Sequence, residues 1–259
     1  MNIFQQLLKS LYSPSTISTF RYQKIGKTIL YVFTLMLIVS IPPSFMLGSG
    51  INSFFVKTEF HLTETFPDFE IVNGVLHAEN SDPIIINEDE DVIIFDPSGN
   101  VTANDISEYE SAFAILEREA IFISGGIQES FHYQEFGLNF TKSELVSLVD
   151  SVSGILPLLI GLLSVFMYLY LTASKFVGIF ALSVLAIILN KKRKTNLSYK
   201  QNWTLSAYIV TLPTILFAIF DILYLQIPIA FTIYWGIAFV ILFNVFKGIP
   251  ARSSSMDSN

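Results

Sequence analysis

Four long apolar runs and one broad mixed segment divide this chain of 259 residues. The apolar runs cover residues 28–47, 151–190, 203–223 and 227–246, and each reaches the roughly 20 residues that a helix needs to cross a bilayer. Residues 48–150 instead alternate short apolar segments with turn-forming residues. The pattern predicts an α-helical polytopic membrane protein with four spans and an inserted extracytoplasmic α+β domain.

The run 151–190 holds a single charged residue, Lys175, and ends at the basic cluster Lys191, Lys192, Arg193 and Lys194. As a helix it would be roughly 60 Å long, about twice the hydrocarbon core, so two crossings would be cramped. Basic residues near membrane ends favour the cytoplasm, and one crossing places most of them there. We therefore predict one long helix with Lys175 reaching the inner headgroups, and two crossings remain the alternative.

This topology places both termini in the cytoplasm and residues 48–150 outside the plasma membrane. The cytoplasmic parts are then the leader 1–27, the basic loop 191–202 and the tail 247–259. A cleaved signal peptide is the competing interpretation of the first apolar run. The long positively charged leader and the lack of an Ala-x-Ala site favour an uncleaved anchor.

The leader contains two helix signals. Residues 2–12 place apolar side chains on one helical face, which predicts a helix that lies in the inner interface or one that packs against the bundle. Ser13-Pro14 then offers an N-cap followed by proline at the first helical position, which predicts a second short segment.

The segment 48–150 carries strand and turn signals. Asn73-Gly74 between 69–72 and 75–77 predicts a hairpin with a type I′ turn, because both residues accept positive φ values. Further strands are predicted at 84–86, 92–95, 114–116, 120–123 and 128–136.

Turn and helix-start signals connect these strands. Asp96-Pro97-Ser98-Gly99 fits a type I turn with proline second and glycine fourth. Thr102 and Asp105 resemble a capping box that opens a short helix through residue 110. Thr141 and Glu144 form a second such pair, which opens the helix that becomes the central apolar run.

Charge is strongly segregated along the chain. Residues 48–152 hold twenty acidic and three basic residues, a balance of −17, whereas the remainder holds twelve basic and two acidic residues, a balance of +10. A segment this acidic is expected neither to bind nucleic acid nor to lie on an anionic leaflet. The chain has no cysteine, which excludes disulfides, thiol nucleophiles and thiolate metal sites.

Few residues are candidates for chemistry. Asp221 is the acid within a predicted span, and an intramembrane carboxylate is a functional candidate, although its place near the outer end of the span favours a solvated residue. Lys175 is expected near the inner face of the membrane, so we do not expect it to pair with Asp221. The acidic run 88–91 does not match an EF-hand loop, and His61, His77 and His132 show no zinc motif and are expected on the surface or in strands. No catalytic set, cofactor site or metal site is predicted, and the basic cluster is expected to anchor the topology, with anionic lipid as a compatible ligand.

Two sets of motifs resemble known membrane-protein families. One set resembles the end of the Yip-type (Ypt-interacting protein) membrane domain. It consists of the polar and aromatic residues 198–200, then Tyr208 and Pro213, and the terminal Gly248-Ile249-Pro250. A larger set resembles uncharacterised membrane proteins of Gram-positive bacteria, catalogued as a domain of unknown function and in part labelled maltodextrin-utilisation proteins. Its residues are Tyr12, Ser13, Pro14, Arg21, Asn73, Gly74, Asp96, Pro97 and Gly99.

These features lead to one functional hypothesis and one alternative. We expect a non-enzymatic membrane protein with a sensing, scaffolding or accessory function, whose external domain binds a ligand and whose helices contact the bilayer and a membrane-protein partner or a second copy. The alternative is a transport or lipid-handling protein, which includes the accessory role in sugar uptake that the family label implies. The sequence does not identify a ligand.

Overall fold

The computed structural model describes residues 1–88, 91–135, 137, 139–193, 195, 197–225 and 227–250. Within these residues the protein is mostly helical, with four long apolar helices and two small sheets. The chain forms two compact units. We call Met1–Ser49 with Ile160–Asn259 the helical unit, and Gly50–Leu159 the sheet unit.

Two long helices contribute residues to both units. α3 (Ile25–Phe60) has 36 residues and α5 (Lys142–Arg193) has 52. α3 continues past Pro42 and Pro43 and beyond the predicted end of the first span at residue 47. It does so because Phe54 and Phe55 at its far end pack against apolar side chains of the sheet unit.

Six further helical elements belong to the helical unit in the described part of the chain. They are α1 (Ile3–Tyr12), α2 (Pro14–Thr19), the 3₁₀ turn η1 (Phe20–Tyr22), α6 (Tyr199–Ile209), α7 (Thr211–Ile222) and α8 (Ala230–Lys247). In the described part of the chain, four segments are long and apolar enough to cross a membrane: Ile25–Thr65, Lys142–Lys191, Tyr199–Ile222 and Ala230–Lys247.

The predicted third span, 203–223, coincides with the candidate span Tyr199–Ile222, which the structure divides into two helices, α6 and α7. The helices meet at Val210, where α6 ends. Pro213 explains the break, because proline has no N–H to donate to the preceding turn but is tolerated in the first turn of a new helix.

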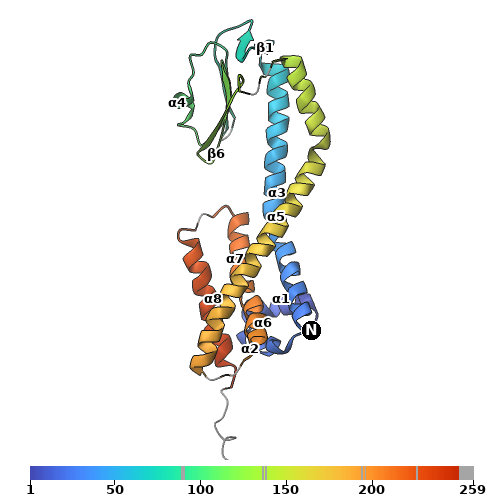
Figure 1. The fold of residues 1–259 in the computed structure, drawn as a ribbon, viewed down its shortest axis with the longest axis vertical. Helices are drawn as coiled ribbons and strands as arrows, with labels where there is room; N and C mark the ends of the chain where they lie inside the picture. Colours follow the sequence, from blue (N-terminus) through green and yellow to red (C-terminus); the bar gives the residue numbers. More distant parts are fainter. Residues whose placement is uncertain are drawn as a thin grey trace, which may run out of the picture. The chain divides into compact units, whose positions relative to one another are not determined.

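α6 forms the centre of the helical unit, beside α1 and α2 (Figure 1). All its residues from Asn202 to Ile209 are buried. Ser13 caps α2 and Pro14 takes its first position, which confirms that predicted start signal. α1 buries Gln6, Leu7 and Ser10 against the unit, as a packing helix does, while its opposite face remains exposed.

The described residues of the sheet unit form eight short strands. They are β1 (Phe69–Val72), β2 (Val75–Ala78), β3 (Ile84–Glu88), β4 (Asp91–Asp96), β5 (Ser111–Leu116), β6 (Glu119–Ser124), β7 (Ile127–His132) and β8 (Phe140–Thr141). The smaller sheet has the order β2-β1-β8 and is antiparallel. The larger has the order β3-β4-β5-β6-β7, in which β4 and β5 are parallel and the other neighbours antiparallel.

Local signals in this unit are largely confirmed. Asn73 and Gly74 have φ values of 53° and 78°, and the strands on either side pair Val72 with Val75. Both capping boxes form reciprocal hydrogen bonds, at Thr102 with Asp105 and at Thr141 with Glu144.

Two elements of the sheet unit are shorter than predicted. α4 (Ala103–Ile106) ends four residues before position 110, because the chain must turn back there to place β5 parallel to β4. β7 ends at His132, after which Tyr133 turns inward and donates its hydroxyl to the Leu116 and Glu119 carbonyls. Residue 136, the predicted end of that strand, lies outside the described residues.

The central strands of the larger sheet are packed on both faces, whereas its edge strand β7 is exposed. On one face, Ile93, Phe95 and Ile115 form a core with Phe66 and with Val149 of α5. On the other, Ile94, Ala114 and Ile121 pack with Ile106 of α4. The end of α3 and the beginning of α5 are therefore parts of the hydrophobic core of the sheet unit.

Candidate functional sites

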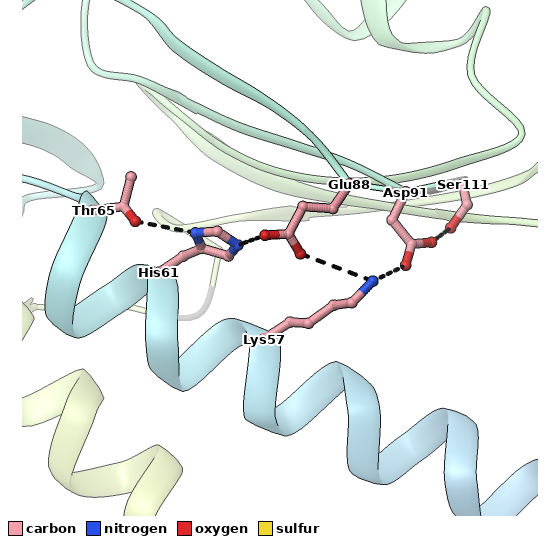
Figure 2. A network of polar contacts seen from close by, with 6 residues as sticks. All are labelled: Lys57, His61, Thr65, Glu88, Asp91 and Ser111. Carbon is pink, nitrogen blue, oxygen red and sulfur yellow. Dashed lines mark hydrogen bonds and ion pairs between the residues drawn. The ribbon is translucent and has the colours of Figure 1, made fainter.

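A polar network joins the end of α3 to the larger sheet (Figure 2). Lys57 and His61 lie four residues apart on the same helical face, His61 opening the π-helical turn η2 (His61–Thr65). The Lys57 Nζ lies 3.0 Å from Oδ2 of Asp91 and 3.9 Å from Oε2 of Glu88. The His61 Nε2 lies 3.1 Å from Oε1 of Glu88, and its Nδ1 lies 3.2 Å from the Thr65 hydroxyl.

Asp91 is the most tightly held carboxylate of this network. The Ser111 hydroxyl donates to its Oδ1 at 2.7 Å, and Lys57 donates to its Oδ2. These hydrogen bonds, with that of Ser111 first, lower the pKa of the Asp91 carboxyl below its ordinary value of 3.8. Each member has a protein partner, and the network connects the end of α3 to strands β3, β4 and β5 of the larger sheet.

The network corrects the prediction made for His61. His61 is only 3% exposed and lies at a helix end, whereas we expected the histidines on the surface or in strands. His77 and His132 do lie in strands and are exposed. Of the acidic run, Glu88 and Asp91 belong to the network, and residues 89 and 90 lie outside the described part. The described residues contain no group of three or more side chains able to hold a metal ion.

Asp96 of the motif Asp96-Pro97-Ser98-Gly99 is fully buried and closes its own turn. Its carboxylate accepts hydrogen bonds from the backbone N–H and hydroxyl of Ser98 and from the N–H of Val101. Gly99 has a φ of 75°, and a Cβ there would lie 2.7 Å from the Glu117 carboxylate. Asp96, Ser98 and Gly99 of this motif therefore have structural roles in forming the turn.

An apolar cavity of about 490 Å³ lies in the sheet unit between the two sheets and the beginning of α5. Its walls include Ile71, Phe113, Phe131 and Tyr133 from the strands, and Leu145 and Leu148 from α5. Burial raises the pKa of the Tyr133 phenol, which therefore remains neutral at physiological pH. The volume is within the range of pockets that bind small molecules.

A second cavity, of about 460 Å³, lies in the helical unit between α3, α5, α7 and α8. Lys175 of α5 and Asp221 of α7 both line it. The Lys175 Nζ donates to the Thr214 hydroxyl at 2.9 Å and to the Tyr234 hydroxyl at 3.0 Å, and it lies 4.8 Å from the centre of the Tyr234 ring.

Lys175 has partners within the protein that the sequence did not indicate. Its side chain is hydrogen-bonded to hydroxyl groups of α7 and α8, and its reach to the headgroups stays a prediction. Asp221 is exposed, lies one residue before the end of α7 and forms no ion pair with Lys175. Lys175 and Asp221 nevertheless line the same cavity, which was not expected from their predicted places near opposite faces of the membrane.

The remaining motif residues lie in the helical unit. Tyr208 is fully buried, and its hydroxyl donates to Oε1 of Gln6 at 2.8 Å. Arg21 donates to the Ser18 carbonyl and lies over the Tyr22 ring. Gly248 caps α8, Ile249 is buried and Pro250 is exposed. Tyr12 is exposed at the end of α1.

The basic cluster is described only in part. Lys191 lies in the last turn of α5 and is exposed. The side chains of Lys192 and Arg193, and all of Lys194, lie outside the described residues, as does the tail from residue 251.

The chain was compared with models of known protein families. A family model described as "Protein of unknown function (DUF1189)" matches residues 4–246. Neither a search of curated proteins nor a search of solved structures gave a match.

Proposed function

The chain belongs to the DUF1189 family of proteins of unknown function, and we propose that it is a non-enzymatic, multi-pass protein of the plasma membrane with a sensing role. In this proposal both termini are cytoplasmic, and the sheet unit lies outside and binds a small apolar ligand. The response is passed to a membrane-protein partner or to a second copy of the chain.

The surface of α5 supports a membrane location. Phe166, Tyr170 and Val177 are 60%, 72% and 68% exposed, and they lie in a run whose single charge is Lys175. A continuous apolar helix surface of this kind is unfavourable in water and marks contact with lipid or protein.

The distribution of charge supports the proposed orientation. The residues with a balance of −17 include most of the sheet unit, and the basic residues cluster in the segments that flank the apolar runs. Basic flanks favour the cytoplasmic side. The sheet unit then lies on the opposite side of the membrane.

The apolar cavity of the sheet unit is the observation on which the sensing role rests. Leu145 and Leu148 form part of its wall and belong to α5, which continues without a break to Arg193. A ligand in this cavity touches the helix that also supplies the second candidate span. Binding can bias that helix only through such differential contacts.

Single cysteines test the orientation, because the chain has none of its own. Gln128 and Lys191 are exposed and suit substitution. We expect an impermeant thiol reagent on intact cells to label Gln128→Cys and to label Lys191→Cys only after lysis. The opposite pattern would place the sheet unit in the cytoplasm and end the proposal of external sensing.

A fluorescent apolar probe, N-phenyl-1-naphthylamine, tests the cavity in the purified full-length protein. Leu148→Gln adds a polar group to the cavity wall, and we expect it to weaken probe binding. Ile127→Gln is the matched control, because Ile127 is 68% exposed and does not line the cavity. Equal binding by both variants would mean that the probe binds elsewhere.

A transport or lipid-handling function, including an accessory role in sugar uptake, is the second candidate. The cavity that holds Lys175 and Asp221 favours it, because ionisable residues within membrane helices often mark substrate pathways. Reconstituted protein should then move solute or lipid, and Asp221→Asn should change the rate. An unchanged rate in that variant would remove Asp221 from any such pathway.

A further inference from the structure

The cavity of the helical unit contains a positive charge whose partners are neutral. Lys175 donates to two hydroxyl groups and faces one aromatic ring. No described carboxylate forms an ion pair with it. The hydroxyls and the ring stabilise the ammonium group but do not cancel its charge.

The hydroxyl groups are themselves held in place. Thr214 donates to the Val210 carbonyl at 2.6 Å, so its lone pairs are turned toward Lys175. The Tyr234 and Thr214 oxygens are 3.0 Å apart. Lys175 has three N–H donors and uses two on these groups, which leaves one for a ligand. Lys175 is therefore a preorganised cation in the wall of the cavity.

The rest of the cavity wall is apolar and aromatic. Phe217, Phe231 and Trp235 form part of it, together with aliphatic residues of α3 and α5. Asp221 lies on the same face of α7 as Thr214, about 10 Å farther along the helix axis. A ligand therefore meets one cationic end, a long apolar wall, and a carboxylate that repels a second negative group.

We propose that this cavity binds an amphiphile with a single anionic group, a carboxylate or a phosphate, which contacts Lys175 while its apolar part lies against the aromatic wall. The site is independent of the sensing role proposed for the sheet unit, and it requires no transport. The anionic group comes either from a free fatty acid or from a phospholipid of the bilayer.

Tryptophan fluorescence gives a direct readout. The chain has two tryptophans, and only Trp235 lines the cavity. Trp203 is buried with no described hydrogen-bond partner for its N–H, so Trp203→Phe removes no hydrogen bond that the structure describes. The full-length Trp203→Phe protein in detergent micelles then reports from Trp235 alone.

The probe is 9,10-dibromostearic acid, whose bromines quench nearby indoles, with its methyl ester as the uncharged control. We expect saturable quenching by the acid and at least about tenfold weaker binding of the ester, the effect of losing one charged hydrogen bond. Brominated phosphatidylglycerol identifies the source, because quenching by it alone assigns the site to bilayer lipid. Equal quenching by acid and ester would overturn the proposal, since the probe would then only mix with the detergent around the protein.

Variants at position 175 test whether the charge of Lys175 is what binds the acid. Lys175→Met should weaken binding of the acid about tenfold or more and leave the ester unchanged, whereas Lys175→Arg should retain binding of the acid. Lys191→Met is the matched control, because Lys191 lies on the same helix but is exposed and outside the cavity. Normal binding of the acid by Lys175→Met would exclude Lys175 from the site. The acid and ester comparison in the protein with Lys175 decides the proposal if Lys175→Met fails to fold.

Discussion

Replacing Tyr208 by phenylalanine removes one hydroxyl group from the centre of the helical unit. That hydroxyl donates to Oε1 of Gln6 at 2.8 Å, and both residues are fully buried. The change leaves the glutamine oxygen without this donor, and an unsatisfied buried acceptor costs about 1–3 kcal/mol. We therefore expect Tyr208→Phe to lower the free energy of unfolding by about that amount.

Removing the whole side chain adds a packing defect. The Tyr208 ring lies 4.5 Å from that of Phe20 and 4.3 Å from that of Tyr31, measured between ring centres. Replacement of a large buried aromatic residue by alanine typically costs about 3–5 kcal/mol. Tyr208→Ala should therefore be clearly less stable than Tyr208→Phe.

Thermal unfolding of the purified full-length protein in detergent measures both changes. Tyr12→Phe is the matched control, because it removes the same group from a residue that is 66% exposed, and we expect a shift within about 0.5 kcal/mol. A double-mutant cycle with Gln6→Leu isolates the hydrogen bond. Additive effects of Tyr208→Phe and Gln6→Leu, or equal stability of the two phenylalanine variants, would refute the structural role of this bond.

Two further predictions concern the sheet unit. Gly74→Ala should lower stability by at least about 1–2 kcal/mol, because φ is 78° and the new Cβ would lie 2.9–3.0 Å from Gln134. Gly50→Ala is the control and should be neutral or stabilising, because Gly50 lies in a helix with free space around the new Cβ. Urea unfolding of the two variants compares their stabilities. Asp91→Asn should remove a pH-dependent part of stability. Since folding lowers the pKa of Asp91, its contribution is complete above the ordinary value of 3.8 and is lost as the pH falls through the folded pKa. The stability gap between the native protein and Asp91→Asn should therefore narrow as the pH falls below 3.8, and a gap that stays constant there would contradict this assignment.

Signals that act over a few residues predicted the local structure well. Asn73-Gly74 specifies its turn through the two positive φ values, and the Thr102 and Thr141 capping boxes need only a partner three residues away. These interactions are complete within one turn of chain. The long apolar runs likewise predicted helices, because length and hydropathy are properties of the segment itself.

Contacts between distant segments were not predictable in this way. Lys57 and Asp91 are 34 residues apart, and nothing near either residue specifies the other. The i and i+4 spacing of Lys57 and His61 places them on one face of a helix. This inference requires that α3 extend beyond residue 47, where the predicted span ends. The extension depends on the packing of Phe54 and Phe55 against the sheet unit, which is itself a long-range contact.

Lys175 shows how the same limitation affects functional reasoning. Hydropathy assigns a cost of about 2.5–3.5 kcal/mol to a lysine at the centre of a span, and we resolved that cost by placing the side chain at the headgroups. In the structure its partners are hydroxyl groups 39 and 59 residues farther along the chain, on two other helices. A cation with hydroxyl ligands needs no headgroup to stabilise it, so the depth of Lys175 cannot be deduced from its charge. Its neutral partners also leave a positive charge facing the cavity, and for that reason the residue that we predicted to reach the headgroups is the one on which we base a binding site.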